Sequence, residues 1–260
     1  MSLIETSRSA NIFTITLNRP EKYNSFTEPM GLDLQEALKE AENIDIRCVI
    51  LNANGKAFCA GQDLPEVVER AKQDDYELAD TVRITYNPVI KAIRNLEKPV
   101  VCAVQGTAAG AGANMAFSCD IVIASHEAKF IQAFSKIGLI PDSGGTFILP
   151  RLIGPARTNA MYLLDETITA EEAVSMGLIY KSVNHNKLEE ETINVSKKLA
   201  DMPTKGFGLY KKAINSSFEN TLSEQLELEA EYQTLAGNTH DFREGVAAFL
   251  EKRRPDFKGK

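Results

Sequence analysis

The sequence predicts an α/β protein, with one large domain of alternating strands and helices followed by a helical region. Short β-branched runs alternate with segments whose apolar residues recur at spacings of three and four, the order typical of α/β folds. From about residue 188 onward the pattern becomes wholly helical. The 260 residues exceed an average domain, but single α/β domains of ~250 residues are common. We therefore expect a core over residues 1–200 and a helical region over residues 201–260.

The N-terminal elements are predicted from periodicity and turn chemistry. Residues 11–18 are rich in β-branched and aromatic side chains, which predicts a strand that ends at Arg19-Pro20. Residues 25–43 predict a helix, because their apolar residues recur at spacings of three and four and Thr27 can cap the first turn. The apolar run at 48–51 is followed by turn residues and predicts a buried strand.

Two junctions rich in small residues organise the middle of the chain, one at 58–64 and one at 106–114. Around them we expect helices over 66–72 and 80–96, a strand over 99–104, a helix that the second junction opens and that runs through Phe117, and a buried strand over 120–124. The order strand, small-residue turn, helix, strand therefore occurs twice.

The C-terminal half begins with shorter elements. We expect a strand over 128–132, a helical turn over 134–137, a loop at 141–145, a helix from about Thr146 and a strand over 178–183. Thr169 and Glu172 have the spacing of a capping box at the start of another helix. The remaining chain predicts helices over 188–201, 205–217, 221–237 and 240–252.

The composition excludes several classes of function. The net charge of −7 gives no electrostatic reason to expect nucleic acid or an anionic membrane as a partner. No apolar run approaches the ~18–20 residues of a membrane span, and the N-terminus lacks the layout of a secretory signal, so we expect a cytoplasmic protein. The cysteines are widely spaced in apolar surroundings, which favours buried thiols over disulfides and predicts no metal site: Cys48, Cys59, Cys102 and Cys119.

The two small-residue junctions offer the same chemical group. Each places a backbone N–H where a helix begins, at Gln62 and at Ala111, and such groups favour developing negative charge. If the two meet in space they form an oxyanion hole for a carbonyl that becomes an enolate. The spacing does not show that they meet, and the run Gly106–Asn114 is also explained by a tightly packed helix. A dinucleotide-binding loop is excluded, because the G-x-G-x-x-G spacing is absent.

Seven segments in order make the sequence recognisable. They are Leu17–Asn24, Phe58–Leu64, Gln105–Gly112, Cys119–Ala124, Gly138–Gly145, Ala170–Gly177 and Phe249–Pro255. With these segments the chain resembles the crotonase family, also called the enoyl-CoA hydratase/isomerase superfamily, over nearly its whole length.

The resemblance implies a spiral of repeated ββα units, the ClpP/crotonase-like fold, with C-terminal helices that form a trimerisation or lid region. It further implies homotrimers or dimers of trimers, acyl-CoA thioesters held as enolates, and no separate cofactor, because coenzyme A is part of the substrate. By position, Gln62 and Ala111 supply the oxyanion amides, and their side chains matter less than their N–H groups. The resemblance places these residues at the substrate or CoA: Lys22, Asn24, Ala60, Gly61, Asp63, Leu64, Gly110, Asn114 and Phe134.

One departure from the family pattern indicates the reaction. Hydratases of the family hold water with two glutamates, and the matching positions here are Asn114 and Phe134. A carboxylate stands instead at Asp142, and the run Ala133–Gly145 resembles the branch of ring-1,2-epoxyphenylacetyl-CoA isomerases. Isomerisation needs one group that takes a proton and returns it, and a carboxyl with a pKa raised by apolar neighbours suits that role. The alternative is that Asp142 only caps the following helix.

The predicted function is therefore acyl-CoA isomerisation, most specifically of 2-(1,2-epoxy-1,2-dihydrophenyl)acetyl-CoA. Three alternatives stay open, namely a Δ3,Δ2-enoyl-CoA isomerase, an enoyl-CoA hydratase in which Asp142 activates water, and a non-catalytic acyl-CoA-binding trimer. The basic cluster Lys252–Arg254 is either a solvated face or a contact for CoA phosphates.

Overall fold

The computed structural model describes residues 2–260, and its strands form two sheets. The larger sheet has the order β1–β2–β3–β5–β7–β10 and the smaller sheet has the order β4–β6–β8–β9. The strands of the larger sheet are β1 (Ile4–Ser9), β2 (Ile12–Leu17), β3 (Cys48–Ala53), β5 (Val100–Val104), β7 (Ile121–Ser125) and β10 (Lys181–Val183). Those of the smaller sheet are β4 (Ala57–Cys59), β6 (Thr107–Ala109), β8 (Lys129–Ile131) and β9 (Ile168–Thr169).

The two sheets arise from a repeated unit. The pairs β3 and β4, β5 and β6, and β7 and β8 each give one strand to each sheet, and helices separate the pairs along the chain. Neighbouring strands from successive pairs run parallel in both sheets. This is a spiral of ββα units, so the predicted fold is confirmed.

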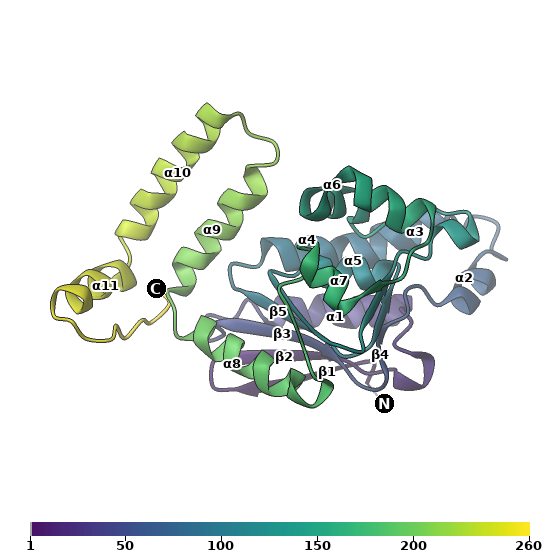
Figure 1. The fold of residues 1–260 in the computed structure, drawn as a ribbon, viewed down its shortest axis with the longest axis horizontal. Coiled ribbons are helices and arrows are strands. Elements are labelled where there is room, and N and C mark those ends of the chain that lie inside the picture. Colours follow the sequence, from purple (N-terminus) through teal and green to yellow (C-terminus); the bar gives the residue numbers. More distant parts are fainter. Residues whose placement is uncertain (1) are drawn as a thin grey trace.

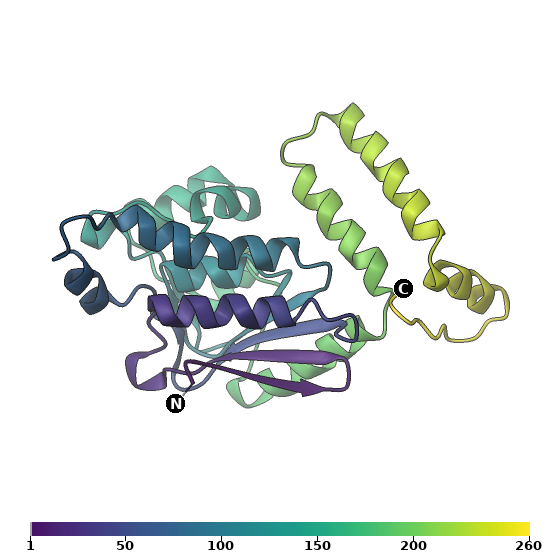
Figure 2. The same cartoon turned by 180° about the vertical axis from the view of Figure 1, so that it is seen from behind.

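Helices cover both faces of the larger sheet. On one side lie α1 (Glu28–Glu40) and α4 (Asn87–Asn95), which contact each other and run side by side in Figure 2. On the other side, α8 (Leu188–Ala200) packs against β3, β5 and β7. Helices α5 (Ala111–Phe117) and α7 (Ala170–Ser175) contact the smaller sheet, and α6 (Gly145–Leu163) packs against α5. Helices α2 (Leu64–Arg70) and α3 (Leu78–Thr81) follow β4 along the chain. Short 3₁₀ turns are η1 (Pro20–Lys22), η3 (Ser135–Ile137) and η4 (His185–Lys187).

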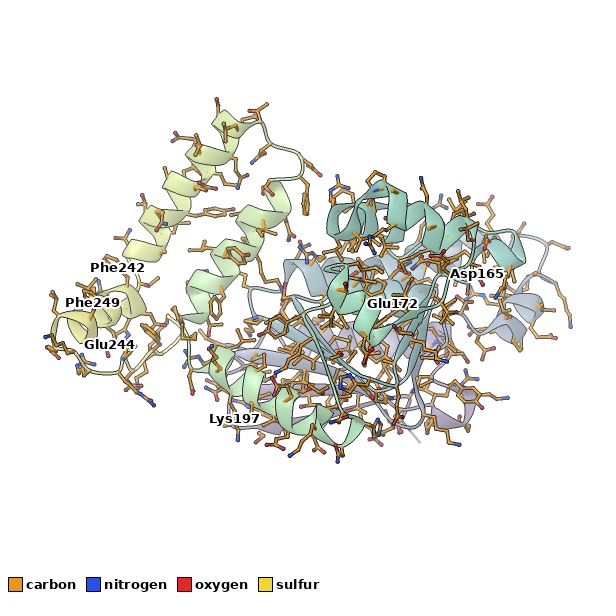
Figure 3. The ribbon with its side chains drawn as sticks, in the orientation of Figure 1. Asp165, Glu172, Lys197, Phe242, Glu244 and Phe249 are labelled. Carbon is orange, nitrogen blue, oxygen red and sulfur yellow. The ribbon has the colours of Figure 1, made fainter. Side chains whose placement is uncertain are left out.

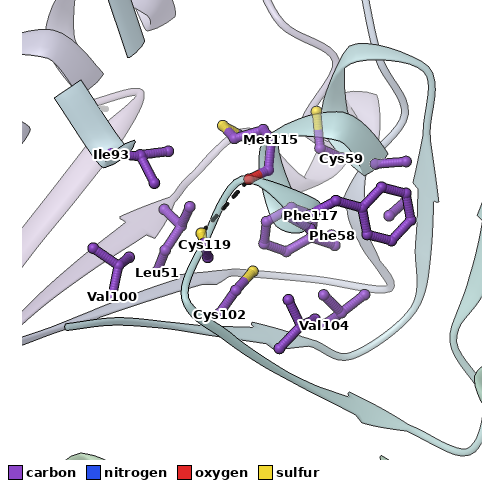
Figure 4. Close-up of a cluster of buried hydrophobic side chains, with 14 of the residues drawn as sticks. Leu51, Phe58, Cys59, Ile93, Val100, Cys102, Val104, Met115, Phe117 and Cys119 are labelled. Carbon is purple, nitrogen blue, oxygen red and sulfur yellow. Dashed lines mark hydrogen bonds between the residues drawn. The ribbon is translucent and has the colours of Figure 1, made fainter. Parts of the chain in front are cut away.

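The main core lies between the larger sheet and helices α1, α4 and α5. Figure 4 shows how Cys102 and Val104 of β5 share one cluster with Met115 and Phe117 of α5. The Cys119 thiol donates a hydrogen bond to the Met115 carbonyl at 3.6 Å. All four cysteines are buried free thiols, as predicted.

The C-terminal helices extend away from the core (Figure 1). They are α9 (Thr204–Ser216), α10 (Leu222–Gly237) and α11 (His240–Leu250). Buried Lys211 ties α9 to the core, because its Nζ donates to Asp120 Oδ2 at 2.7 Å and to the carbonyls of Ile93 and Lys98. Figure 3 shows Phe242 and Phe249 on α11, far from the core, and both side chains are exposed.

The structure departs from the sequence prediction at several elements, one of which is the two-residue strand β9. Strand β1 was not predicted, because only Ile4 of its residues is buried and the segment lacks apolar alternation. Strand β6 occupies part of the run that was expected to open a helix, since small residues fit a crowded strand equally well. The helix expected over 80–96 contains a π-helical turn, η2 (Val82–Tyr86), between α3 and α4.

Candidate active site

A cavity of about 300 Å³ lies where both small-residue junctions meet the turn η2 and the segment 132–142. Eight of the residues predicted at the site line it: Ala60, Gly61, Gln62, Leu64, Gly110, Ala111, Phe134 and Asp142. Much of the remaining wall is apolar, with Val67, Leu78, Val82, Ile137 and Leu139. The arrangement suits a ligand with one reactive polar group and an apolar body.

Strand pairing brings the two junctions together. Strand β4, which precedes the first junction, pairs in parallel with β6, which precedes the second. A Cβ at Gly61 would lie 3.0 Å from the Ala109 carbonyl oxygen and 3.9 Å from the Ala111 nitrogen. A Cβ at Gly112 would lie 2.6 Å from Cys59 Cβ. The small residues therefore serve tight packing, and the same packing places Gly61, which precedes Gln62, beside the start of α5.

The hydrogen bonds of the preceding carbonyls set the direction of both amides. The Gly61 carbonyl accepts from the Phe26 N–H at 2.7 Å, and the N–H of Gln62, on the other edge of that trans peptide, points the opposite way. Similarly, the Gly110 carbonyl accepts from Asn114 N–H at 3.0 Å, so the Ala111 N–H points out of the start of α5. Within residues 2–260 neither N–H has a hydrogen-bond acceptor. Two free donors on one cavity wall can stabilise an oxyanion.

Asp142 is the carboxylate of this cavity. Its side chain is half-buried, and its Oδ1 accepts a hydrogen bond from Ser143 Oγ at 2.9 Å. Burial raises the pKa of Asp142 above its ordinary value of 3.8, and the Ser143 hydrogen bond offsets part of that rise. The carboxylate is therefore a stronger base than a fully exposed one, which suits proton abstraction.

The raised pKa predicts how Asp142 affects stability. The folded protein binds this proton more tightly than the unfolded chain, so ionised Asp142 lowers the free energy of unfolding at neutral pH. Asp142→Asn removes that charge and is expected to raise the free energy of unfolding at pH 7. The gain should shrink as the pH falls through the folded-state pKa and should vanish only well below 3.8, where the carboxyl is protonated in both states. Urea unfolding at pH 7 and pH 4 measures it, and an equal effect at both would contradict this account.

Asn114 supports the Asp142 loop from behind. Asn114 Nδ2 donates to the Asp142 carbonyl at 2.9 Å, and Asn114 Oδ1 accepts from Gln132 Nε2 at 3.1 Å. The Asp142 carbonyl can only accept a hydrogen bond, so the group facing it must be the NH₂ of Asn114. This fixes the orientation of the Asn114 amide and, through it, that of the Gln132 amide. Gly145 packs so closely that a Cβ there would lie 2.4 Å from Asn114 Nδ2. Asn114 is buried and is not among the residues that line the cavity, so the structure shows it supporting the loop, and its expected contact with substrate remains a prediction.

The segment 132–136 forms another wall of the cavity and is fixed from outside. Asp165 Oδ1 accepts from the Ala133 N–H at 3.2 Å, and Asp165 also pairs with Lys136. These contacts hold Ala133 at a positive φ of 58° and present buried Phe134 to the cavity.

Asn24 and Asp63, also predicted at the ligand, make structural contacts, and their expected contact with CoA remains a prediction. The fully buried Asn24 side chain accepts from the Arg19 N–H at 2.8 Å and donates to the carbonyls of Asn54 and Ala57 at 2.9 Å each, so it shapes the turn. Asp63 Oδ1 caps α2, and its Oδ2 pairs with Arg19 at 2.6 Å. Burial alone would raise the pKa of Asp63, but hydrogen bonds, first that from Arg19, hold it below its ordinary value.

Lys22 differs from these two because it is exposed. It lies on η1 and outside the cavity wall. The structure thus places it apart from the eight residues gathered at the cavity, and its expected contact with CoA remains a prediction.

Tyr86 is a site residue that the sequence did not indicate. It is buried at the end of the turn η2, lines the cavity and stacks at a tilt on Phe26, with ring centroids 5.3 Å apart. Its hydroxyl donates a hydrogen bond to Gln62 Oε1. Burial, followed by the nearby charge of Asp142, raises the pKa of Tyr86 well above 10, so the hydroxyl is a neutral donor at physiological pH. A single tyrosine inside a predicted helix carries no signal of such a role.

Two kinds of feature are absent from residues 2–260. No cluster of three or more His, Cys, Asp or Glu side chains there has the geometry to bind a metal ion. No helix in that part of the chain is both long and apolar enough to cross a membrane.

Comparisons with known proteins agree with this geometry. The family model for enoyl-CoA hydratase/isomerase matches residues 7–260. The chain is 48% identical to 1,2-epoxyphenylacetyl-CoA isomerase from Escherichia coli K12, over 100% of both chains. It is 38% identical to trans-2-decenoyl-[acyl-carrier-protein] isomerase from Streptococcus mutans, over 96% of this chain and 95% of that protein.

Solved structures give the same result for the fold. The crystal structure of an enoyl-CoA hydratase from Bacillus anthracis superposes with a TM-score of 0.92 at 32% identity, covering 99% of this chain and 100% of that one. Sequence, fold and cavity agree, and the chain belongs to the enoyl-CoA hydratase/isomerase family.

Proposed function

We propose that the protein is a CoA-thioester isomerase in which Asp142 moves a proton and the N–H groups of Gln62 and Ala111 hold the enolate. The observation that carries this proposal is that Asp142 is the only carboxylate among the described residues lining the cavity, and that Gln62 and Ala111, whose N–H groups have no acceptor, line the same cavity. Asp142 takes the proton from carbon 2, and the electron pair of that C–H bond moves onto the thioester oxygen. The resulting carboxylic acid returns the proton to a different carbon as the double bonds shift. Substrate and product therefore have the same composition.

The nature of the walls supports isomerisation over hydration. Hydration needs a water molecule that polar groups hold against the substrate, whereas Phe134 presents an apolar ring and Asn114 is buried behind the Asp142 loop. The aromatic and aliphatic lining fits an acyl group derived from a ring. Together with the 48% identity to 1,2-epoxyphenylacetyl-CoA isomerase, this supports 2-(1,2-epoxy-1,2-dihydrophenyl)acetyl-CoA as the substrate. The cytoplasmic location expected from the sequence remains a prediction.

The reaction type is tested by comparing two rates on one preparation. Because no second carboxylate lines the described cavity to position water, isomerisation of a 3-enoyl-CoA is expected to be much faster than hydration of crotonyl-CoA. Absorbance at the conjugated thioester follows both reactions, since one forms that chromophore and the other removes it. Hydration at an equal or higher rate would reject the isomerase assignment. Binding of both thioesters without turnover would support a non-catalytic role.

We further propose that the C-terminal helices mediate a homotrimer or a dimer of trimers. Phe242, Phe249 and Leu250 are exposed on α11 beside an apolar cavity of about 420 Å³, and a second copy of the chain is the expected cover. Within the basic cluster Lys252–Arg254, Arg253 is already bound to Glu244 and Glu251, which leaves Lys252 and Arg254 for a CoA phosphate.

Light scattering at micromolar concentration tests the assembly. A mass of three or six chains of 28.6 kDa is expected, because this apolar face needs a partner. Phe249→Asp on the exposed face should lower that mass, whereas Tyr180→Asp, an exposed position on the core, should leave it unchanged. A wild-type mass of one chain would contradict the proposal.

A further inference from the structure

The Gln62 side chain is held at both ends, although the oxyanion role needs only its backbone. Its Nε2 donates to the Phe26 carbonyl at 3.3 Å, and its Oε1 accepts from the Tyr86 hydroxyl. The Phe26 carbonyl also accepts from the Asp63 N–H at 3.0 Å, one residue beyond Gln62. The backbone on either side of Gln62 is thus hydrogen-bonded to Phe26. The Gln62 side chain adds a further hydrogen bond to Phe26 and links it to Tyr86.

Tyr86 itself is placed by an unusual turn. In η2 the Asn87 N–H donates to the Val82 carbonyl, five residues earlier, and such turns recur at functional sites. Helix α1 supports this turn, because Gln35 Nε2 donates to the Ile84 carbonyl at 2.8 Å. A Cβ at Gly31 of α1 would lie only 2.9 Å from Thr85 Cβ, so the turn has little room to shift. The hydroxyl of Tyr86 therefore comes from a rigid element.

We propose that Tyr86 is a positioning residue that acts through the Gln62 side chain to hold the Gln62 N–H at the oxyanion position. The inference rests on the proposed enolate chemistry. Its physical basis is that an oxyanion donor contributes only when it is fixed in place before the charge develops. The side chain and the N–H share one Cα, so fixing the amide end of Gln62 restricts rotation of the peptide that carries the donor. The side chain of Gln62 thus has a role that the sequence did not predict.

The test removes each end of the link separately and together. Tyr86→Phe keeps the ring on Phe26 and deletes the hydroxyl, whereas Gln62→Met keeps the backbone N–H and deletes the polar end of the side chain. Loss of a whole oxyanion donor lowers kcat by ~10²–10³-fold, and a displaced donor is expected to cost about tenfold. Because a displaced donor affects the enolate more than the ground-state thioester, KM should change less than about twofold. The double variant should be no slower than either single variant, since both remove the same link.

Tyr76→Phe is the matched control. It also loses a tyrosine hydroxyl contact on the neighbouring segment, at 2.8 Å to Thr81 Oγ1, without touching Gln62. It should keep kcat within about twofold of the wild type. Thermal unfolding of each variant identifies any general loss of structure.

Exchange of the carbon 2 protons of phenylacetyl-CoA in heavy water separates this inference from the proposed function, because exchange requires enolate formation but no isomerisation. Exchange by the wild type that falls about tenfold in Tyr86→Phe would support the inference. Unchanged exchange in Tyr86→Phe would overturn the inference alone. Losses that multiply in the double variant would also overturn it, because Tyr86 would then act on the ligand independently of Gln62. Failure of the wild type to exchange would reject the proposed function, and this inference with it.

Discussion

Asp142→Asn is expected to lower the isomerisation rate by ~10²–10⁴-fold, the usual cost of removing an acid/base group. The substitution keeps size and shape, and Asn can still accept the hydrogen bond that Ser143 Oγ donates to the side chain. The carbonyl of residue 142 still accepts from Asn114 Nδ2, so the loop should keep its place. What is lost is the proton acceptor.

Two measurements separate chemistry from structure in this variant. Calorimetric affinity for a product-like CoA thioester should survive, because the variant leaves the amides of Gln62 and Ala111 untouched. Exchange of the carbon 2 protons into heavy water should fail even while the thioester is bound. Parallel loss of turnover and affinity would indicate that Asp142 only organises the loop, and exchange at the wild-type rate would identify another residue as the base.

Gly61→Ala is expected to lower kcat by ~10²–10³-fold, as loss of one oxyanion donor does. Gly61 has a φ of +88°, and its added Cβ would meet the Ala109 carbonyl oxygen at 3.0 Å. An alanine at this position must escape both the contact and the left-handed backbone conformation. The backbone rotation that achieves this moves the peptide that carries the Gln62 N–H. Steady-state kinetics with a 3-enoyl-CoA measures the loss.

Gly177→Ala is the control for backbone strain. Gly177 has a similar φ of +78°, but it is exposed. A Cβ added there would lie 4.0 Å from its nearest neighbour, the Leu152 carbonyl oxygen. Both variants should lose stability to the left-handed backbone, by roughly 1–2 kcal/mol each, but only Gly61→Ala should lose kcat. Equal losses of kcat in the two variants would show that the effect is general instability.

The helical elements could be predicted well because local signals determine them. The helix predicted over 188–201 is α8 at 188–200, and that predicted over 240–252 is α11 at 240–250. Thr169 and Glu172 form the predicted capping box. Strands β1 and β9 escaped prediction because pairing with neighbours forms them: only Ile4 of β1 is buried, and the two residues of β9 are too few to show a pattern.

The site was predictable in its parts but not in all its roles. Motif order indicated Gln62, Ala111 and Asp142, and the structure brings all three to one cavity. The sequence places Asn24 and Asn114 near the site, but it does not show whether their amides serve the ligand or the protein backbone. Both amides bond to backbone carbonyls that lie far away in the sequence. Tyr86 depends on a π-helical turn that neither composition nor periodicity reveals.

The hydrogen bonds that join Gln132, Asn114 and the Asp142 carbonyl limit which substitutions position 114 can accept. Returning a hydratase-like carboxylate through Asn114→Glu would set an acceptor against the Asp142 carbonyl, which needs the donor that Asn114 Nδ2 now supplies. The longer side chain would also press on Gly145, which leaves no space beside Asn114. The single substitution Asn114→Glu is therefore expected to displace the loop that carries Asp142. We expect Asn114→Glu alone to lose isomerisation without gaining hydration, so that a change of reaction would need position 114 and the loop around residues 142–145 to be replaced together.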